Sequence, residues 1–280
     1  MAAPAPTPTR VRATLIGVSG RMGQALLRAA PAFPRLNITG AVASPTSLSL
    51  GRDAGEVAGV GCLHLPIISD LARALHDADV AIDFSTAAAT RTNLAACRAA
   101  RKPLLICTTG LAAELDGALA AAAREIPLLV AANTSLGVTL LLELVRIAAR
   151  ALPPAFDIDI LDMHHRSKQD APSGTALALG AVARAARQSS AAAGGASGAA
   201  ALGDGAHREG EVGFASVRAG DLVGEHTVLF AGPGEALSLT HRATDRGIFA
   251  RGALAAALWL QSRPPGRYTM RDLLHQKTVT

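Results

Sequence analysis

The sequence has few aromatic residues: one tryptophan, one tyrosine and six phenylalanines in 280 residues. A surface that stacks nucleic-acid bases needs several exposed rings, so this scarcity argues against a nucleic-acid partner. The net charge is only +5 and the arginines are dispersed, which suits a small anionic ligand or cofactor better. Dispersed arginines are equally expected on an ordinary solvated surface.

Long apolar runs and cysteine are scarce as well. No run reaches the roughly 18 to 20 residues that cross a bilayer, and the proline-rich residues 1–9 lack the features of a secretion signal. We therefore expect no membrane partner, and a short disordered tail at 1–9. Cys62, Cys97 and Cys107 are odd in number and lack metal-ligand spacing. They predict buried free thiols in a reducing cytoplasm.

Lysine is the rarest charged residue, since only three of the 27 lysines and arginines are lysines: Lys102, Lys168 and Lys277. Lys168 lies in the densest run of reactive side chains, residues 162–175, three positions after the second of two adjacent histidines. Lysine can release a proton, whereas arginine effectively cannot. This run is therefore the first candidate for an active site.

The first half of the chain alternates strand and helix signals. Continuous apolar strands that alternate with helices are typical of a parallel sheet covered on both faces. The sequence thus predicts an α/β fold with an N-terminal Rossmann-type, doubly wound parallel sheet. The expected strands are 11–16, 37–42, 80–84, 104–107 and 128–131, and the expected helices are 22–30, a helix capped by Ser69 or Asp70 and ending at Leu75, 86–101 and 111–124.

From about residue 136 the pattern changes to a second α+β domain with an open mixed sheet. Successive strands without intervening helices indicate antiparallel or mixed pairing. We expect a dinucleotide-binding domain at 10–135, completed by 246–280, and a substrate-binding and oligomerisation domain at 136–245. A flexible loop is expected near 188–206. The expected elements are helices 138–150, 174–187 and 248–261 and strands 156–162, 212–218, 226–231 and 236–241, and the last helix is expected to pack on the first domain.

A glycine-rich turn joins the first strand to the first helix. Its glycines let the backbone approach a diphosphate, whose charge the free N–H groups of the helix start can hold. In this strand–turn–helix context the turn predicts nucleotide binding rather than a purely structural role. The candidate cofactor residues of this turn are Gly17, Val18, Ser19, Gly20, Arg21 and Met22, and Gly23 completes the spacing.

The end of the second strand bears on the choice of cofactor. An acidic residue there would bind the ribose hydroxyls of NAD, but the chain has Ala43 and Ser44 instead. Ser44 and its hydroxyl neighbours could accept a 2′-phosphate with help from Arg21 or Arg52. The sequence therefore favours NADPH, with NADH possible.

Two further turns follow strands of the same expected sheet, where ligands of such folds bind. Each turn could also be an ordinary polar helix cap. Their candidate cofactor residues are Cys107, Thr108 and Thr109 in the first turn and Ala131, Ala132, Asn133 and Thr134 in the second.

The run at 162–175 supplies the candidate catalytic residues. His164 is interpreted as a general acid, and His165 and Lys168 as groups that meet anionic oxygens. The following turn, Ser173–Gly174–Thr175, would form a helix start that binds a carboxylate. A single histidine of this kind could be an ordinary loop or core imidazole. No metal site is expected, because adjacent histidine side chains diverge.

Three aspartates precede the histidines. Asp157, Asp159 and Asp162 are best explained as a solvated strand face. Asp162 alone is close enough in sequence to orient His164.

The chain resembles the 4-hydroxy-tetrahydrodipicolinate reductase family, formerly dihydrodipicolinate reductase, over nearly its whole length. The run from His164 to Thr175 is the most specific motif, and the glycine turn at 17–23 adds to it. Further matching segments are 83–86, 108–110, 132–135 and 213–226.

The resemblance implies reduction of a cyclic dicarboxylate by a nicotinamide cofactor with loss of water, in lysine and diaminopimelate biosynthesis. It implies that His164 is the proton donor and Lys168 the second catalytic cation. His165, Gly174 and Thr175 match the substrate-binding groups, and the three turns named above match the nucleotide contacts. It also implies a homotetramer formed through the sheet of the second domain.

Three positions depart from the family pattern. Ala43 replaces a frequent acidic ribose anchor, and Asp162 replaces the usual glutamate, a shorter arm of the same charge. Thr134 replaces an aromatic residue found in some members, so a ring contact near the cofactor is expected to be absent. The alternatives are another NAD(P) reductase of an amino or imino dicarboxylate, such as an aspartate dehydrogenase, and a nucleotide-sensing protein without catalysis.

Overall fold

The computed structural model describes residues 10–188 and 211–275. The expected tail at 1–9 and nearly all of the expected loop at 188–206 lie outside these residues. The chain divides into two compact units, which we call unit 1 (Met1–Ser135 with Gly247–Thr280) and unit 2 (Leu136–Arg246). The sequence placed the domain boundaries after residues 135 and 245. The functional roles of the two domains remain predictions.

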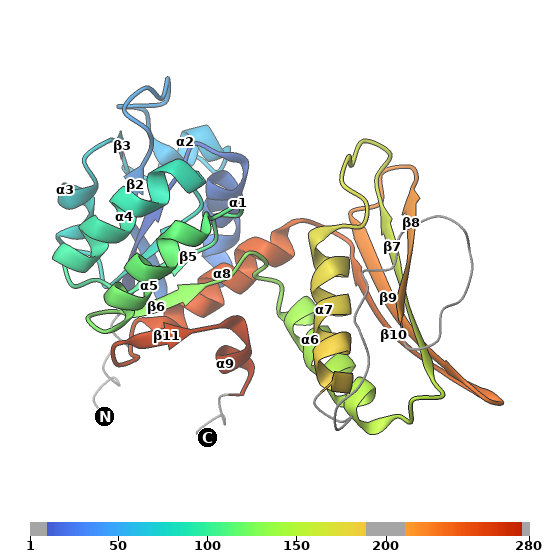
Figure 1. The fold of residues 1–280 in the computed structure, drawn as a ribbon. Helices are drawn as coiled ribbons and strands as arrows, with labels where there is room; N and C mark the ends of the chain where they lie inside the picture. Colours follow the sequence, from blue (N-terminus) through green and yellow to red (C-terminus); the bar gives the residue numbers. More distant parts are fainter. Residues whose placement is uncertain (1–9, 189–210, 276–280) are drawn as a thin grey trace, which may run out of the picture. The chain divides into compact units, whose positions relative to one another are not determined.

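Unit 1 is built on a seven-stranded sheet whose neighbouring strands all pair in parallel. The strand order is β11-β6-β5-β4-β1-β2-β3 (Figure 1). Every residue of β4 and β5 is buried, as expected for strands covered on both faces. The strands are β1 (Val11–Ile16), β2 (Leu36–Val42), β3 (Ile67–Ile68), β4 (Val80–Asp83), β5 (Leu104–Ile106), β6 (Pro127–Val130) and β11 (Gly266–Tyr268).

Helices cover both faces of this sheet. One apolar layer includes Leu26 of α1 and Leu254 of α8, and the other includes Leu94 of α4 and Leu119 of α5. The expected return of the C-terminal helix to this domain and the doubly wound Rossmann-type fold are thus confirmed. The helices of unit 1 are α1 (Arg21–Ala29), α2 (Ala54–Ala58), α3 (Leu71–Leu75), α4 (Ala87–Ala99), α5 (Asp116–Ala123), α8 (Gly247–Leu260) and α9 (Met270–Leu274).

Unit 2 contains a four-stranded mixed sheet in the order β10-β9-β7-β8. Strand β7 (Asp157–His164) pairs in parallel with β8 (Val212–Arg218) and antiparallel with β9 (Gly224–Gly232), which pairs antiparallel with β10 (Glu235–Ala243). Helices α6 (Leu136–Ala151) and α7 (Gly174–Gln188) pack against the side chains of Ile158, Ile160 and Phe230. The expected mixed sheet is confirmed.

Some local predictions were wrong or incomplete. The helix expected from residue 111 begins at Asp116, because Ala112 is extended and a 3-10 turn at Ala113–Leu115 intervenes. The elements α2, β3, β11 and α9, none longer than five residues, were missed. Cys97 and Cys107 are buried, but Cys62 is exposed. Among the described helices, none combines the length and apolar character that crossing a bilayer requires.

Candidate active site

A cavity of about 590 Å³ opens in unit 1 where β4, β5 and β6 end and α1 begins. It brings together the three turns that the sequence singled out. Gly17, Val18, Ser19 and Ser44 are not among the residues that line it. The lining residues are Gly20, Arg21, Met22, Phe84, Ser85, Thr86, Ala87, Cys107, Thr108, Thr109, Ala131, Ala132, Asn133, Thr134 and Phe249.

The glycines of the first turn make its tight path possible. Gly17 has a φ of +84°, and a Cβ there would lie 2.7 Å from the Phe84 carbonyl oxygen. A Cβ on Gly23 would lie 2.5 Å from the Gly17 carbonyl oxygen. Both positions therefore require glycine for close backbone packing. Gly17 and Gly23 shape the turn, and Gly20 is left to face the cavity.

Two features of the cavity fit the diphosphate and polar groups of a dinucleotide. No side chain caps the start of α1, so its N–H groups and the positive end of its dipole are left for an anion. The Thr108 hydroxyl is buried and has no hydrogen-bond partner in the described structure. A buried hydroxyl without a partner is costly, and a bound ligand that reached it would remove that cost.

Cys107 contributes shape rather than reactivity to this cavity. Burial, and then the nearby Asp83, raises the pKa of its thiol well above the ordinary value. Asp83 itself is buried, accepts the Ser85 backbone N–H at 2.8 Å and the Asn93 amide at 3.0 Å, and so holds the turn after β4. A protonated, buried thiol is a poor nucleophile.

Aromatic side chains do reach the cavity, from elements other than the Thr134 turn. Phe84 and Phe249 line it, whereas the Thr134 hydroxyl donates to the Phe249 carbonyl oxygen at 2.7 Å. Thr134 therefore ties its turn to α8. Two aromatic residues thus line the cavity even though residue 134 is not aromatic.

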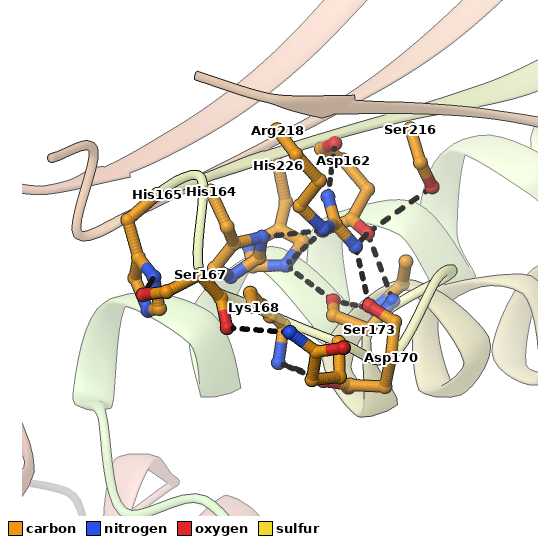
Figure 2. A network of polar contacts seen from close by, with 12 residues as sticks. Asp162, His164, His165, Ser167, Lys168, Asp170, Ser173, Ser216, Arg218 and His226 are labelled. Carbon is orange, nitrogen blue, oxygen red and sulfur yellow. Dashed lines mark hydrogen bonds and ion pairs between the residues drawn. The ribbon is translucent and has the colours of Figure 1, made fainter. Parts of the chain in front are cut away.

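A second polar centre lies in unit 2, at the end of β7, around Asp162 (Figure 2). The Asp162 carboxylate is fully buried, which corrects the expectation of a solvated face; Asp159 is exposed and Asp157 only partly buried. Side chains alternate along a strand, so Asp162 lies on the opposite face from the other two. Its Oδ2 accepts the Ser173 backbone N–H at 2.8 Å and Nη2 of Arg218 at 2.9 Å.

The other oxygen of Asp162 meets two imidazoles. Its Oδ1 lies 2.8 Å from Nδ1 of His164 and 3.3 Å from Nε2 of His226. Burial alone would raise the pKa of this carboxyl, but hydrogen bonds from His226, Ser173 and Arg218 outweigh it and hold the pKa well below the usual range. Asp162 is therefore ionised, and its Oδ1 lies within ion-pair distance of Nδ1 of His164, the residue that the sequence suggested it could orient.

His164 is nearly buried, with an 8% exposed surface. The pKa of its imidazole is lowered to about 4, chiefly by burial and also by the neighbouring His226, Lys168 and Arg218, against the opposing effect of Asp162. In the free protein at neutral pH this ring is uncharged. It becomes a proton donor only when added negative charge nearby raises its pKa.

Asp162, His164 and His226 lie within 4.8 Å of one another, the one such cluster that the described residues offer a metal ion. Arg218 already places a positive charge on the same carboxylate. A metal cation at this carboxylate would be repelled by the Arg218 guanidinium. The neighbouring His165 points elsewhere, toward Ser167 and Arg246.

The remaining predicted cations lie in the loop after β7. Nζ of Lys168 is held 2.7 Å and 2.9 Å from the two oxygens of Asp170. Nε2 of His165 lies 3.1 Å from Nη2 of Arg246. Lys168 therefore has a carboxylate partner within the chain, which a substrate carboxylate would have to replace or share.

Ser173 begins helix α7 and links it to the Asp162 centre. Its hydroxyl accepts the Ala176 backbone N–H at 3.2 Å and lies 3.0 Å from Nε2 of His226. Gly174 is exposed and Thr175 half-buried, in the first turn of this 15-residue helix. The start of such a helix attracts carboxylates.

Comparison with known proteins bears on both centres. The family described as "Dihydrodipicolinate reductase, N-terminus" matches residues 11–134, and "Dihydrodipicolinate reductase, C-terminus" matches residues 137–274. The chain belongs to the dihydrodipicolinate reductase family. It is an oxidoreductase, and its Rossmann-type fold and family indicate a nicotinamide cofactor.

Individual relatives match at similar levels. The 4-hydroxy-tetrahydrodipicolinate reductase of Alkalilimnicola ehrlichii is 47% identical over 273 residues, covering 94% of this chain and 98% of that protein. The enzyme of the same name from Rhizobium rhizogenes is 45% identical over 279 residues, covering 96% and 98%. Dipicolinate-bound dihydrodipicolinate reductase from Paenisporosarcina sp. TG-14 shares the fold, with a TM-score of 0.75 at 22% identity over 93% of this chain and 98% of that one.

The sequence of this dihydrodipicolinate reductase family member did not reveal several residues that contact the predicted site residues. Arg218 and His226 lie in the matching segment 213–226, but only the pairing of β7 with β8 and β9 shows that they face Asp162. Asp170 and Arg246 hold Lys168 and His165. The alternation of side chains along a strand could have placed Arg218 on one face of its sheet. It could not have shown that this strand pairs with β7, beside Asp162.

Proposed function

We propose that the chain reduces 4-hydroxy-tetrahydrodipicolinate to tetrahydrodipicolinate with loss of water. The observation that carries this proposal is the buried Asp162–His164 pair next to the start of helix α7, Ser173–Thr175, in a chain of this reductase family. A bound nicotinamide dinucleotide would supply the hydride. The chain itself would bind the dianionic substrate, exclude water and deliver the proton.

The cavity of unit 1 would hold the nucleotide. The N–H groups at the start of α1 suit the diphosphate, and the Thr108 hydroxyl offers an unused donor and acceptor. The segments that line the cavity, Gly20–Met22, Cys107–Thr109 and Ala131–Thr134, are the residues that the family resemblance assigns to the cofactor. Gly17, Val18 and Ser19 would act by shaping the turn.

The substrate's two carboxylates would bind to the cationic loop of unit 2. Lys168 and His165 offer charge and hydrogen bonds, and Gly174 and Thr175 lie in the first turn of α7. Asp170 would release Lys168, in whole or in part, when a substrate carboxylate arrives. Lys168 would then also stabilise negative charge that develops during the reaction.

His164 would donate the proton that quenches the charge built up on the substrate ring by hydride addition. Since its pKa in the free protein is about 4, the proton must be taken up when the dianion binds. Binding at pH 7 should therefore be accompanied by uptake of about one proton per site. Titration calorimetry with dipicolinate in buffers of different ionisation enthalpy measures this uptake. A binding enthalpy independent of the buffer would contradict the assignment, and His164→Gln is the control that should remove the uptake.

The end of β2 favours NADPH. Ser44 is exposed and bonded to Thr46 at 3.0 Å, and Ala43 offers no carboxylate. The nearest acid along the chain, Asp53, accepts four backbone N–H groups, from Gly55, Glu56, Leu63 and Leu65, so it is occupied structurally. Arg21 and Arg52 are exposed and could meet a 2′-phosphate.

A carboxylate placed at residue 44 tests this preference. Ser44→Asp should repel the 2′-phosphate and offer the ribose hydroxyls an acceptor, shifting the ratio of kcat/KM for NADPH over NADH downward by about 10-fold or more. Leu48→Asp, at a 98% exposed position of the same loop, controls for the change in net charge. Equal shifts in both variants would mean that Ser44 does not contact the ribose.

We also propose that the protein is a cytoplasmic homotetramer assembled through the sheet of unit 2. The described helices of this unit pack on one face of the sheet, and the opposite face carries partly exposed apolar residues, Leu161, Met163, Val217 and Leu229. Light scattering after size-exclusion chromatography measures the subunit number. A monomer at micromolar concentration would contradict the proposal.

The central assay couples the synthase that makes the substrate to NADPH oxidation. Turnover in this assay supports the reductase proposal, and its absence in protein that still binds NADPH would overturn it. Turnover with oxaloacetate and ammonia instead would favour an aspartate dehydrogenase. Cofactor binding without any turnover would favour a nucleotide sensor.

A further inference from the structure

We propose that Gly224 and His226 of β9 are positioning residues for proton transfer by His164. The segment 213–226 matches the family pattern, but the function proposed for the chain gives Gly224 and His226 no part in the reaction. Pairing of β7 with β8 and β9 brings this segment against the catalytic histidine. The inference rests on the proposed role of His164 as the proton donor.

Gly224 keeps the reactive nitrogen of His164 open. Nδ1 of His164 faces Asp162 at 2.8 Å, so Nε2 is the nitrogen left to exchange a proton with the substrate. A Cβ on Gly224 would lie 2.9 Å from this Nε2 and 3.2 Å from Cδ2. A methyl group there would either cover Nε2 or tilt the ring away from Asp162. Glycine is therefore required by the geometry of the proton donor itself.

His226 fixes the carboxylate that orients His164. Directly opposite Asp162 on the paired strand, it places Nε2 3.3 Å from Oδ1 of Asp162 and 3.0 Å from the Ser173 hydroxyl. Its ring packs edge-on against the His164 ring, with centroids 5.1 Å apart. One side chain thus links the orienting carboxylate, the proton donor and the start of α7.

Backbone hydrogen bonds keep this segment in place beside the catalytic loop. The Ala219 N–H donates to the His164 carbonyl oxygen at 2.9 Å, and the Arg166 N–H donates to the Gly220 carbonyl oxygen at 3.1 Å. Nη2 of Arg218 bridges Oδ2 of Asp162 at 2.9 Å and the Asp170 carbonyl oxygen at 2.6 Å. The end of β7 is therefore fixed on both sides, by β8 and by β9.

The test compares two glycines of unit 2 in the full-length protein. Gly224→Ala should lower kcat about 100-fold, the cost of a misplaced catalytic group, with the KM for NADPH changed less than about twofold. Gly234→Ala, in the turn between β9 and β10, is the matched control: its φ of +82° strains an alanine as well, but no atom lies near its Cβ. It should retain kcat. Circular dichroism and NADPH binding confirm that each variant is folded.

Replacements of His226 provide the conservative rescue. His226→Leu should lower kcat about 10- to 100-fold, and His226→Gln, whose amide nitrogen can reach the position of Nε2, should recover much of that loss. Near-equal kcat values for the leucine and glutamine variants would mean that His226 only fills space.

A cycle with His164→Gln separates this inference from the proposed function. If His164 retains its assigned role, His164→Gln is nearly inactive and Gly224→Ala in that background causes little further loss, since both act on one step. If His164→Gln is fully active, the assignment of the proton donor is wrong. If it is inactive but Gly224→Ala keeps wild-type kcat, or loses the same factor in both backgrounds, the positioning role is wrong.

Discussion

The two polar centres of this protein differ in the kinds of chemical groups that form them. The cavity of unit 1 is lined mainly by small residues, backbone groups and short polar side chains, and its shape depends on Gly17 and Gly23. The centre of unit 2 is a buried charge network in which Asp162 contacts His164, His226, Ser173 and Arg218. The first site offers N–H groups and space, whereas the second holds ionisable groups out of water.

This difference teaches what each site can do. A site lined mainly by small and uncharged residues has almost no groups that titrate near neutral pH, so it is suited to bind one shape under many conditions. A buried network around one carboxylate sets the protonation of its neighbours and is therefore sensitive to every added or removed charge. The variants below test whether changes in unit 2 alter charge-dependent properties and changes in unit 1 alter only binding.

The largest effect is expected from Lys168→Ala. Removing the cation proposed to meet the substrate should lower kcat by about 100- to 1,000-fold, a size typical of lost electrostatic stabilisation. The melting temperature should change little, because the Lys168–Asp170 pair lies at the surface, where such pairs contribute little to stability. Steady-state assays and thermal melts measure both. Lys102→Ala in unit 1 is the matched control. Comparable activity losses in the two variants would contradict the proposal that charged groups of unit 2 act in the reaction while unit 1 binds the cofactor.

A second effect concerns stability in acid. The pKa of His164 is lowered to about 4 in the folded protein, chiefly by burial, so the unfolded chain takes up its proton first as the pH falls. The stability from keeping His164 neutral is present above pH 6.5 and is lost as the pH falls from 6.5 toward 4. Between pH 7 and pH 5 the free energy of unfolding should drop by about 2 kcal/mol from this residue. Asp162, whose pKa is also lowered, adds its own loss only below about pH 4.

Urea denaturation at pH 7 and pH 5 measures this loss, and His164→Gln separates its source. The variant should lose much less stability over the same interval. A smaller loss should persist, because burial and His226 also lower the pKa of His241. If the wild type and the variant show the same pH dependence, the charge network of unit 2 is not the source of the acid sensitivity.

The sequence predicted most of the fold because its strands and helices are long enough to show their periods. The strand at 11–16 has the predicted bounds, and Asp70 caps α3 as one of the two residues proposed. Short elements such as α2 and β11 could not be found in this way, since they show neither a repeat nor the apolar run that marked the equally short β4 and β5. The start of α5 was predicted too early, because local helix preference does not reveal the 3-10 turn at Ala113–Leu115 that precedes the helix.

In the candidate sites, the residues that could be predicted are those that lie close to one another in the sequence. The glycine turn and the run from His164 to Thr175 each carry their signal within a few residues. The burial of Asp162 and its contact with His226 depend on pairing between strands more than 60 residues apart, a register that no local pattern specifies. Phe249 reaches the cavity of unit 1 from the far end of the chain for the same reason.

The smallest expected effect is in unit 1, at the unpartnered hydroxyl of Thr108. Thr108→Val keeps the shape of the side chain and removes a group that has no hydrogen bond in the described structure. The free protein should therefore be as stable as the wild type or slightly more stable, whereas the KM for NADPH should rise by about 3- to 10-fold, the value of one hydrogen bond. Thr90→Val is the matched control, because the Thr90 hydroxyl is buried in the same unit but donates to the Thr86 carbonyl oxygen at 3.1 Å. That variant should lose about 1 kcal/mol of stability without a change in KM. If Thr108→Val instead destabilises the protein and leaves KM unchanged, the hydroxyl has a structural partner. The proposal that a bound cofactor provides the missing hydrogen bond in this cavity would then be wrong.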